Sequence, residues 1–259
     1  MGTIEIPKMG EAMKISIQEK VVVVTGASSG IGAALSVELG KSGAKVALIG
    51  RNLERLDATK NKLLPFTRDV STHVCDVTDR EQVKGTVAVI FRKYGQIDGL
   101  IYSSGIGLPT FYYNFESSQI ESIHRTNFLG MLYWIEQIFP IMKEQKSGFI
   151  VGLSSLAAHL SSKRTAGYTS SKAAVSNFLA GARKGFGKYG IQVLTIEPGY
   201  IKTPMTANNK KMIFPMEVDK AARLILKAIK KGKAVYRFPK ILAFFVRAYE
   251  CLPLFIRTL

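Results

Sequence analysis

The chain has 259 residues, of which 47% are hydrophobic and 21% are charged, and it contains 23 glycines and 9 prolines. This mixture is typical of one folded domain with a substantial core, and it excludes a disordered, collagenous or coiled-coil chain. The 36 Lys and Arg residues exceed the 19 Asp and Glu residues by 17. A basic surplus of this size indicates an anionic partner, whether a phosphate, a nucleic acid or an acidic lipid surface.

Two cysteines, Cys75 and Cys251, cannot make a disulfide framework, so we expect a reducing, cytoplasmic compartment. Residues 1–20 mix acidic and basic side chains without an apolar core, which argues against a secretory signal. The longest strongly apolar stretches, 241–246 and 251–256, are far too short to span a bilayer, so we do not expect an integral membrane protein. We divide the chain into an N-terminal extension (1–19), one domain (20–238) and an amphipathic C-terminal segment (239–259).

Short apolar runs alternate with amphipathic segments from residue 21 onwards. The expected strands are residues 21–24, 45–49, 72–75, 99–103, 149–153, 191–196 and 234–238, and the expected helices are residues 31–41, 52–62, 79–94, 127–143 and 167–189. The first strand is a run of four valines, which is typical of a strand buried on both faces. Strands that alternate with helices at this spacing imply crossover connections. The predicted fold is α/β, a doubly wound and mostly parallel sheet with helices on both faces, and ligands of such sheets lie beyond the carboxyl ends of the strands.

A glycine-rich turn joins the first strand to the first helix, with the sequence Thr25-Gly26-Ala27-Ser28-Ser29-Gly30-Ile31-Gly32. Glycines allow a tight turn and let backbone N–H groups approach a pyrophosphate, to which the helix N-terminus adds the positive end of its dipole. The alternative is that the glycines only punctuate a turn. The strand before the turn and the helix after it favour a dinucleotide cofactor.

The end of the second strand indicates which dinucleotide is bound. A carboxylate at this place holds the ribose 2′-OH of NAD, whereas a basic residue suits the 2′-phosphate of NADP. Here Gly50 stands where an acid is expected and Arg51 follows it, with a guanidinium that can hold a phosphate bidentately. We therefore expect NADP(H) in preference to NAD(H), and the alternative is that Arg51 is a solvated surface residue.

Three polar residues form a candidate catalytic group. Tyr168 and Lys172 are four residues apart, so they share one face of a helix. A nearby ammonium stabilises a phenolate and lowers the tyrosine pKa from about 10, which makes a proton donor for a carbonyl oxygen. Ser155 lies 13 residues before Tyr168, at the end of a strand, where its hydroxyl could hold the same oxygen. The tyrosine and lysine alone are a weak signal, because this pair is common in helices.

Together these features resemble the short-chain dehydrogenase/reductase family in its compact single-domain form, which has a Rossmann-type sheet. The resemblance covers about residues 20–203, and its motifs occur in the right order. They are the turn at residues 25–32, Asp76-Val77 after the third strand, Asn127 in Thr126-Asn127-Phe128-Leu129-Gly130, Ser155, the Tyr168/Lys172 pair and Pro198-Gly199-Tyr200-Ile201-Lys202-Thr203. The resemblance implies an NAD(P)-dependent dehydrogenase or reductase that acts on a CH–OH group.

The resemblance also implies a role for each candidate catalytic residue. Tyr168 would be the general acid in reduction and the general base in oxidation. Lys172 would lower the pKa of Tyr168 and bind the nicotinamide ribose, and Ser155 would orient the carbonyl. Asn127 would anchor a water chain that relays protons, and the alternative is that Asn127 only caps the long helix.

The cofactor contacts follow from the same resemblance. Asp76 and Val77 would contact the adenine, although Asp76 could simply start a turn, and Thr203 would contact the nicotinamide carboxamide. The expected contacts are Thr25, Gly26, Ser28, Ser29, Gly30, Ile31, Gly32, Arg51, Asp76, Val77, Gly105, Tyr168, Lys172, Pro198, Gly199, Ile201 and Thr203, and no metal ligand is expected. The chain departs from the family at Tyr102-Ser103-Ser104-Gly105, where an Asn-Asn-Ala-Gly run is usual. The roles of Ser103 and Ser104 are therefore open.

The loops after the fourth, fifth and sixth strands predict a lipophilic substrate, because aromatic and thioether side chains adapt to apolar surfaces. The candidate lining residues are Phe111, Tyr112, Tyr113, Phe115, Leu156, His159, Leu160, Met205, Met212, Ile213, Phe214 and Met216. The alternative is that about half of them pack in the core, and His159 is expected to be a pocket wall. The predicted reaction is reduction of a carbonyl, or oxidation of a secondary alcohol, on a steroid-like or long-chain 3-keto compound. The alternative function is a catalytically weak, NADP-binding scaffold or sensor at a membrane; the sequence has no nucleic-acid-binding signature.

Two further segments suggest partners. The helix at residues 127–142 is apolar almost all round, so it needs a second partner, and the resemblance to the family implies a homodimer or homotetramer. From residue 199 onwards 13 basic residues face 3 acidic ones, a surplus of 10. The apolar segment that begins at Pro239 carries a narrow polar stripe, which fits a helix lying in an acidic membrane interface. The alternative is a helix that covers the substrate pocket or a neighbouring subunit.

Overall fold

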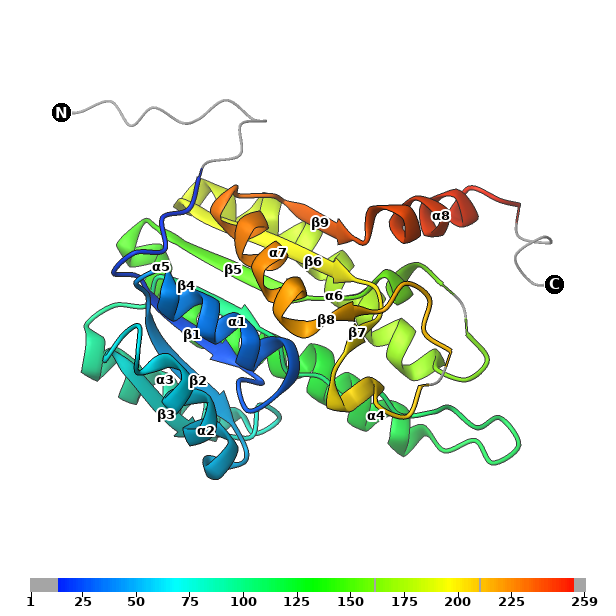
Figure 1. Ribbon diagram of the computed structural model, residues 1–259, viewed down its shortest axis with the longest axis horizontal. Helices are drawn as coiled ribbons and strands as arrows, with labels where there is room; N and C mark the ends of the chain where they lie inside the picture. Colours follow the sequence, from blue (N-terminus) through cyan, green and yellow to red (C-terminus); the bar gives the residue numbers. More distant parts are fainter. Residues whose placement is uncertain (1–13, 161, 210, 254–259) are drawn as a thin grey trace.

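Seven parallel strands form the central sheet of this computed structural model, which describes residues 14–160, 162–209 and 211–253 (Figure 1). The strand order is β3-β2-β1-β4-β5-β6-β9. The strands are β1 (Val21–Thr25), β2 (Lys45–Gly50), β3 (Val70–Val74), β4 (Gly99–Tyr102), β5 (Gly148–Leu153), β6 (Ile191–Pro198) and β9 (Val235–Phe238). The order reverses between β1 and β4, so the predicted doubly wound fold is confirmed and the ligand site is expected at this point.

Helices cover both faces of the sheet. They are α1 (Gly30–Lys41), α2 (Leu53–Leu63), α3 (Arg80–Tyr94), α4 (Ser117–His124), α5 (Gly130–Gln145), α6 (Ala166–Phe186), α7 (Val218–Lys230) and α8 (Lys240–Glu250). The apolar sides of α1, α2 and α7 pack on one face, and those of α3, α5 and α6 pack on the other. A short pair, β7 (Ile201–Lys202) and β8 (Met216–Glu217), lies beside the main sheet, and α8 projects from one end of it (Figure 1).

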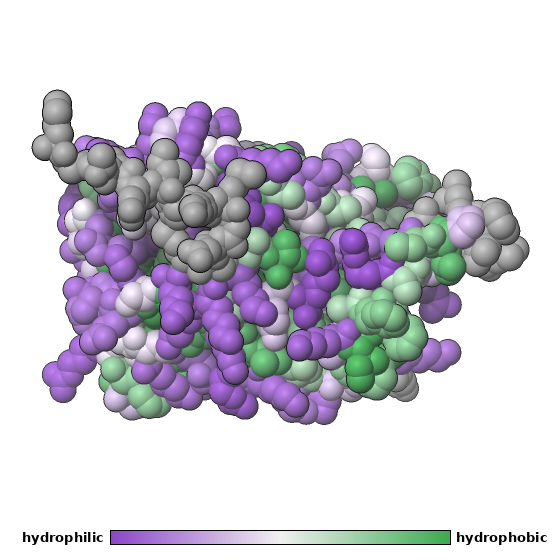
Figure 2. All heavy atoms as spheres, turned by 90° about the horizontal axis from the view of Figure 1, so that it is seen from above, coloured by the Kyte–Doolittle hydropathy of each residue, from purple (hydrophilic) through white to green (hydrophobic). Residues whose placement is uncertain are grey.

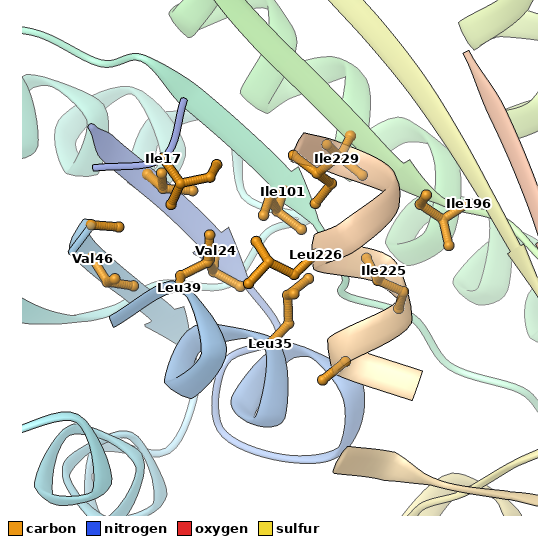
Figure 3. Packing of buried hydrophobic residues seen from close by; sticks show 14 of the residues in the cluster. Ile17, Val24, Leu35, Leu39, Val46, Ile101, Ile196, Ile225, Leu226 and Ile229 are labelled. Carbon is orange, nitrogen blue, oxygen red and sulfur yellow. The ribbon is translucent and has the colours of Figure 1, made fainter. Parts of the chain in front are cut away.

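The packing of α1 and α7 on β1 shows why the four valines form a central strand. Val24 meets Leu35 of α1 and Leu226 of α7 in one buried layer (Figure 3). Ile17 joins this layer and is only 2% exposed. The Ile15 N–H donates to the carbonyl of Lys230 at 3.1 Å. The folded domain therefore starts before Lys20, earlier than the boundary expected from the sequence, while residues 1–13 lie outside the described part.

The largest difference from the predicted elements is around Asn127. The helix expected to start there begins as a π-helical turn, Arg125–Leu129, and continues as α5 from Gly130. A Cβ at Gly130 would lie 2.4 Å from the Tyr102 hydroxyl oxygen, so only glycine lets the helix come this close to β4. Helix α4 was not predicted either, and it lies in a segment expected to be a loop. Within residues 14–160, 162–209 and 211–253, no helix is long and apolar enough to cross a lipid bilayer.

Candidate active site

The glycine turn borders a cleft beyond the carboxyl ends of β1 and β4. Gly26 and Gly30 have φ angles of +66° and +55°, in the left-handed region that favours glycine. A Cβ at Gly32 would lie 2.4 Å from the carbonyl oxygen of Gly26. The side chain of Ser29, which precedes α1, makes no capping bond, so the N-terminal N–H groups of α1 remain available to an anion in the cleft.

The hydroxyl of Thr25 holds the backbone of Ser103 and Ser104, the two residues at which the chain departs from the family. Thr25 Oγ1 accepts from the backbone N–H groups of Ser103 at 3.1 Å and Ser104 at 3.2 Å. The turn after β4 is thus held through its backbone. Thr25 is fully buried and, like the buried Gly32, it supports the turn from behind. The cleft itself is bordered by the other residues expected to contact the cofactor.

Two arginines and a serine gather where β2 ends. Ser28, Arg51 and Arg55 line the cleft, and the Arg51 side chain is 74% exposed, with its Nη1 3.9 Å from Oδ2 of Asp76. Arg55 was not predicted from the sequence. Its signal is the four-residue spacing from Arg51 together with the Asn52 cap, whose Oδ1 accepts from the Arg55 N–H at 2.8 Å. This basic corner fits a phosphate group.

Asp76 serves two purposes in the structure. Its Oδ1 accepts from the backbone N–H of Thr78 at 2.9 Å and from the Thr78 hydroxyl at 2.8 Å, which is the local turn considered as the alternative. Its Oδ2 faces Arg51, and Asp76 and Val77 border the cleft. The turn therefore does not prevent a contact with a bound molecule.

The three candidate catalytic residues meet at the other end of this cleft. Ser155 follows β5 and begins a 3₁₀ turn, Leu156–His159, with its Oγ accepting from the Ala157 N–H at 3.1 Å. Tyr168 and Lys172 lie in the first turns of α6. The Lys172 ammonium donates to the carbonyl of Leu153 at 2.8 Å and lies 5.7 Å from the centroid of the Tyr168 ring. All three side chains border the cleft.

Burial controls the proton affinities of this pair. It lowers the pKa of Lys172 to about 8. It also raises the pKa of Tyr168, although a hydrogen bond with Ser155 acts in the opposite direction. This differs from the sequence prediction, in which Lys172 lowers the pKa of Tyr168. In this geometry desolvation is the larger effect, and Tyr168 is a protonated acid at neutral pH.

Asn127 does not cap α5. Its Oδ1 accepts from the Ile106 N–H at 2.8 Å, and its Nδ2 donates to the carbonyl of Ile106 at 3.0 Å and to the Ser171 hydroxyl at 2.9 Å. Asn127 therefore connects the loop after β4 to α6. A Cβ at Gly105 would lie 3.3 Å from Asn127 Oδ1 and 3.4 Å from Lys172 Nζ. The asparagine is thus close to Lys172, and its role in proton relay stays a prediction.

The cleft is also lined by residues that the sequence did not predict to be cofactor contacts or catalytic residues. They are Gly50, Arg55, Cys75, Ser103, Ser104, Ile106, Thr126, Leu153, Ser154, Met205 and Thr206. Most follow directly after a strand, so the sheet topology is the signal that could have found them. Met205 was named from the sequence as a substrate-lining residue, and the structure places it at the cleft.

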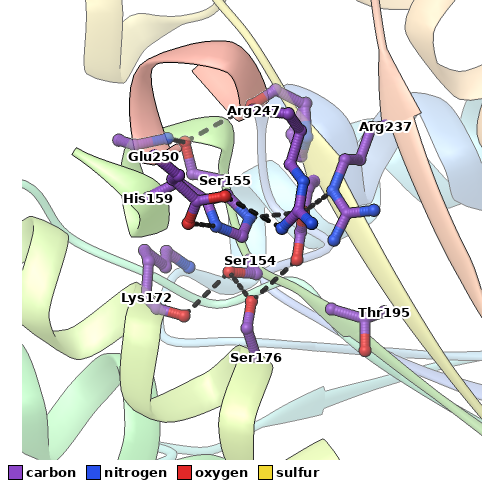
Figure 4. A network of polar contacts seen from close by, with 12 residues as sticks. Ser154, Ser155, His159, Lys172, Ser176, Thr195, Arg237, Arg247 and Glu250 are labelled. Carbon is purple, nitrogen blue, oxygen red and sulfur yellow. Dashed lines mark hydrogen bonds and ion pairs between the residues drawn. The ribbon is translucent and has the colours of Figure 1, made fainter. Parts of the chain in front are cut away.

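His159 lies in a polar network instead of forming a simple pocket wall (Figure 4). Its Nε2 is 2.9 Å from Oε2 of Glu197, and its Nδ1 is 2.6 Å from Oε1 of Glu250. Glu197 lies near the end of β6, is 2% exposed, and also receives bonds from Arg237 and Ser176. Only the imidazolium donates from both ring nitrogens. The two carboxylates raise the pKa of His159.

This network holds α8 next to Ser155, the candidate catalytic serine. Ala243 and Val246 on the inner face of α8 pack against Leu156, the residue after Ser155. A Cβ at Gly199 would lie 2.8 Å from Cδ2 of Leu242. The inner face of α8 therefore packs against residues that follow β5 and β6, next to the cleft, and both alternatives for the C-terminal segment stay predictions. Residues 254–259 of that segment lie outside the described part.

Comparison with known proteins establishes the family. The family model for short chain dehydrogenases matches residues 20–213. The chain belongs to the short-chain dehydrogenase family. An uncharacterised oxidoreductase of Staphylococcus saprophyticus is 35% identical to this short-chain dehydrogenase over 213 residues, which cover 80% of this chain and 91% of the relative. Levodione reductase of Leifsonia aquatica is 32% identical over 228 residues, covering 87% and 85% of the two chains.

Solved structures agree with this assignment. A crystal structure of levodione reductase has a TM-score of 0.80 at 26% identity, and the match covers 88% of this chain and 98% of that chain. A structure of actinorhodin polyketide ketoreductase with NADPH has a TM-score of 0.79 at 23% identity, covering 89% and 99%, which shows the shared fold. This short-chain dehydrogenase is therefore an NAD(P)-dependent oxidoreductase. Its last elements, α7, β9 and α8, lie beyond the residues that the family model matches.

Proposed function

We propose that this short-chain dehydrogenase uses NADP(H) to interconvert a ketone and a secondary alcohol on a lipophilic substrate. The observation that carries the proposal is the meeting of Ser155, Tyr168 and Lys172 at the cleft bordered by the glycine turn. The turn fits a dinucleotide, because Gly26 and Gly30 border the cleft and the N-terminal N–H groups of α1, which Ser29 does not cap, can bind a pyrophosphate.

The basic corner at the end of β2 supports the preference for NADP(H). Gly50 leaves no carboxylate for a ribose 2′-OH, and Arg51 and Arg55 both line the cleft. Arginine binds phosphate through several donors of fixed geometry. A 2′-phosphate at this corner would also compete with Asp76 for Arg51, whose present ion pair is long at 3.9 Å. Arg51 is thus free to turn towards the phosphate at little cost.

The residues of the cleft supply the acid chemistry of reduction. A bound nicotinamide supplies the hydride. Tyr168 holds a proton at neutral pH because burial raises its pKa, and its phenol donates that proton to the carbonyl oxygen. The hydroxyl of Ser155 orients the same oxygen. Lys172, whose pKa is about 8, places its ammonium near the phenol and favours the phenolate that remains after transfer.

The side chains around the cleft support a lipophilic substrate. Ile106 and Met205 line it, and Phe111 and Phe115 stand exposed on the loop after β4. The alternative from the sequence places about half of the candidate lining residues in the core, but the aromatic ones at residues 111–115 are at the surface. The relative named levodione reductase supports reduction of a ketone.

The experiment is a spectrophotometric screen with the full-length protein. NADPH oxidation is followed with a panel of ketones that runs from small polar diketones to steroid-like and long-chain 3-keto compounds, and NADH is used in parallel. We expect turnover that increases with the apolar area of the ketone and a lower KM for NADPH. Tight NADPH binding without turnover of any ketone would instead support the alternative of a scaffold or sensor. Tighter binding of NADH would overturn the preference for NADP(H).

We also propose that the protein is a homo-oligomer that pairs through α5 and α6. Leu129 is 37% exposed in the π-helical turn that precedes α5, and the ring of Phe128 in that turn meets the ring of Phe178 on α6 edge to face at 6.1 Å. Light scattering coupled to size-exclusion chromatography measures the mass. A monomer at all concentrations would contradict the proposal.

A further inference from the structure

Exposed apolar side chains concentrate around the mouth of the active-site cleft. Figure 2 shows hydrophobic side chains gathered at the end of the molecule that carries α8. Three segments near this end of the molecule contribute exposed apolar side chains, namely residues 108–115, 205–214 without residue 210, and 241–245, and we call them together the apolar rim. The most exposed members are Tyr113 (88%), Ile213 (56%), Phe214 (55%), Ile241 (59%), Phe244 (69%) and Phe245 (61%). Large exposed apolar side chains that gather at one end of a molecule indicate an interaction site.

The pattern of α8 separates an inner face from an outer one. Ala243 and Val246 are buried against the domain. Ile241, Phe244 and Phe245 are spaced three and four residues apart, so they share the outer face, and the rings of Phe244 and Phe245 meet at 5.7 Å. The network of His159 and Glu250 fixes α8 with this face outward. In the part of the chain that the structure describes, the outer face of α8 therefore stays exposed to solvent.

The apolar rim is continuous with the cleft. Met205 lines the cleft, and a Cβ at Gly107 would lie 3.5 Å from the Tyr168 ring and 3.9 Å from the Met205 sulfur. The 108–115 segment follows directly on Gly107 and projects from the same end of the molecule as α8 (Figure 1). A lipophilic molecule that leaves an apolar phase at the rim therefore reaches Tyr168 with little exposure to water.

The charges beside the apolar rim select an anionic partner. Lys211 and Lys240 are exposed on or next to its segments, while the exposed Lys202 and Arg247 are paired with Glu217 and Glu250. From residue 199 onwards basic residues outnumber acidic ones by 13 to 3. A second copy would place these cations opposite one another. Anionic phospholipid offers both apolar chains for the aromatic rings and negative headgroups for the cations.

We propose that the apolar rim docks on an anionic phospholipid bilayer and takes lipophilic substrate from it. The docking stands on the exposed rim and its charges alone, and the delivery of substrate rests on the proposed function. The phenylalanines enter the boundary between headgroups and acyl chains, and the lysines remain at the headgroup level. The mouth of the cleft then faces the bilayer.

The test is flotation of the full-length protein with phosphatidylcholine vesicles, with and without phosphatidylglycerol. We expect wild-type protein to float with the anionic vesicles, and high salt to reduce the bound fraction. The double variant Phe244→Ser/Phe245→Ser should bind at least tenfold more weakly, and Ile213→Ser/Phe214→Ser should also bind more weakly. The matched control is Val89→Ser/Phe91→Ser, which replaces side chains 50% and 42% exposed on α3 and should bind like the wild type. Circular dichroism melts and NADPH binding verify that each variant is folded.

The outcomes separate docking from catalysis. Failure of the wild type to float with anionic vesicles, or equal losses in the α3 control, would overturn the proposal. A loss of dimer mass in Phe244→Ser/Phe245→Ser by light scattering would show that the rim contacts a second copy, and would overturn it as well. If the protein floats but reduces no ketone, docking stands and the proposed function fails. If it reduces ketones in solution without floating, the proposed function stands and docking fails.

Discussion

Nδ1 of His159 and Oε1 of Glu250 are 2.6 Å apart, although 91 residues separate them in the chain. His159 ends the 3₁₀ turn that begins after Ser155, and Glu250 ends α8. Oε2 of Glu197 lies 2.9 Å from the other ring nitrogen, Nε2. Because a carboxylate accepts at each ring nitrogen, the two carboxylates favour the doubly protonated imidazolium. The protonation of His159 thus contributes, together with the packing of Ala243 and Val246 on Leu156, to holding α8 beside Ser155.

The first prediction concerns the pH dependence of stability. Hydrogen bonds with Glu197 and Glu250 raise the pKa of His159 above 6.5. A pKa raised in the folded chain adds to the free energy of unfolding fully below the unfolded pKa, and the addition is lost as the pH rises through the folded pKa. The Tm of wild type should therefore exceed that of His159→Gln most at mildly acidic pH. This difference in Tm should narrow as the pH rises above 6.5, and melting curves across that range measure it.

Other titrating groups near His159 do not account for the expected change with pH in the Tm difference between the wild type and His159→Gln. Lys172, with its pKa lowered to about 8, makes the stability rise with pH above that value, and it does so in both proteins. The pKa of Glu197 is lowered, so its contribution is lost only under acid conditions. A difference in Tm that stays constant or widens with pH would contradict the role of the imidazolium.

The second prediction separates the bond of His159 from the exposed ion pair on the same helix. Glu250→Ala removes the partner of His159 and should lower the free energy of unfolding by about 1 kcal/mol, since bonds to charged groups exceed neutral ones. Arg247→Ala removes only a pair at 2.8 Å whose arginine is 57% exposed, and should cost no more than about 0.5 kcal/mol. Hydrogen exchange of residues 240–250 should be faster in Glu250→Ala alone. Equal exchange in the two variants would contradict this ranking.

The third prediction concerns the general acid. Tyr168→Phe removes the phenolic proton while it keeps the ring that borders the cleft. We expect kcat to fall by a factor of about 10² to 10⁴ or more, as is usual when a positioned acid is lost. The dissociation constant for NADPH, measured by fluorescence titration, should change little. Retained turnover with an active ketone would show that Tyr168 is not the proton donor.

The fourth prediction assigns the 2′-phosphate to the basic corner. Arg51→Ala/Arg55→Ala should weaken NADPH binding by a factor of at least about 10, because even one lost bond to a charged group costs about 1.5–3 kcal/mol. NADH binding should be nearly unchanged, since NADH has no 2′-phosphate. Arg92→Ala, in an exposed position of α3, is the matched control for loss of a surface charge. Equal weakening of both cofactors would place the arginines elsewhere on the dinucleotide.

Local patterns predicted those parts of the molecule that depend on neighbours in the chain. The run of valines, the glycine turn and the four-residue spacing of Tyr168 and Lys172 each carry their structural meaning within a few residues. Asn52 is a similar case, because its cap on α2 involves a residue three positions away. The strand order then follows from handed crossover connections. The cleft, and the candidate catalytic residues that border it, follow from these local patterns, while their catalytic roles stay predictions.

Contacts between distant segments were beyond this reasoning. Nothing in the sequence near His159 indicates that Glu197 and Glu250 lie against its two ring nitrogens. The raised pKa of Tyr168 has a similar origin, because desolvation depends on everything that packs around the ring. The sequence predicts that the C-terminal segment is amphipathic. The orientation of α8, however, depends on how Leu242, Ala243 and Val246 pack against the domain. Tertiary packing thus determines which face of α8 is buried against the domain and which face is exposed.

The last prediction compares two helical glycines, Gly32 and Gly85, whose surroundings differ in the structure. A Cβ at Gly32 would lie 2.4 Å from the carbonyl oxygen of Gly26, and no backbone atom of the tight turn can retreat far enough. Gly85 lies in α3 with nothing within 4 Å of such a Cβ. Gly32→Ala should therefore destabilise the fold by several kcal/mol and abolish NADPH binding, whereas Gly85→Ala should stabilise it by about 0.5–1 kcal/mol through helix propensity. Urea denaturation and cofactor titration measure both effects. Normal cofactor binding in Gly32→Ala would show that the turn can open, and would contradict the close approach that defines the site.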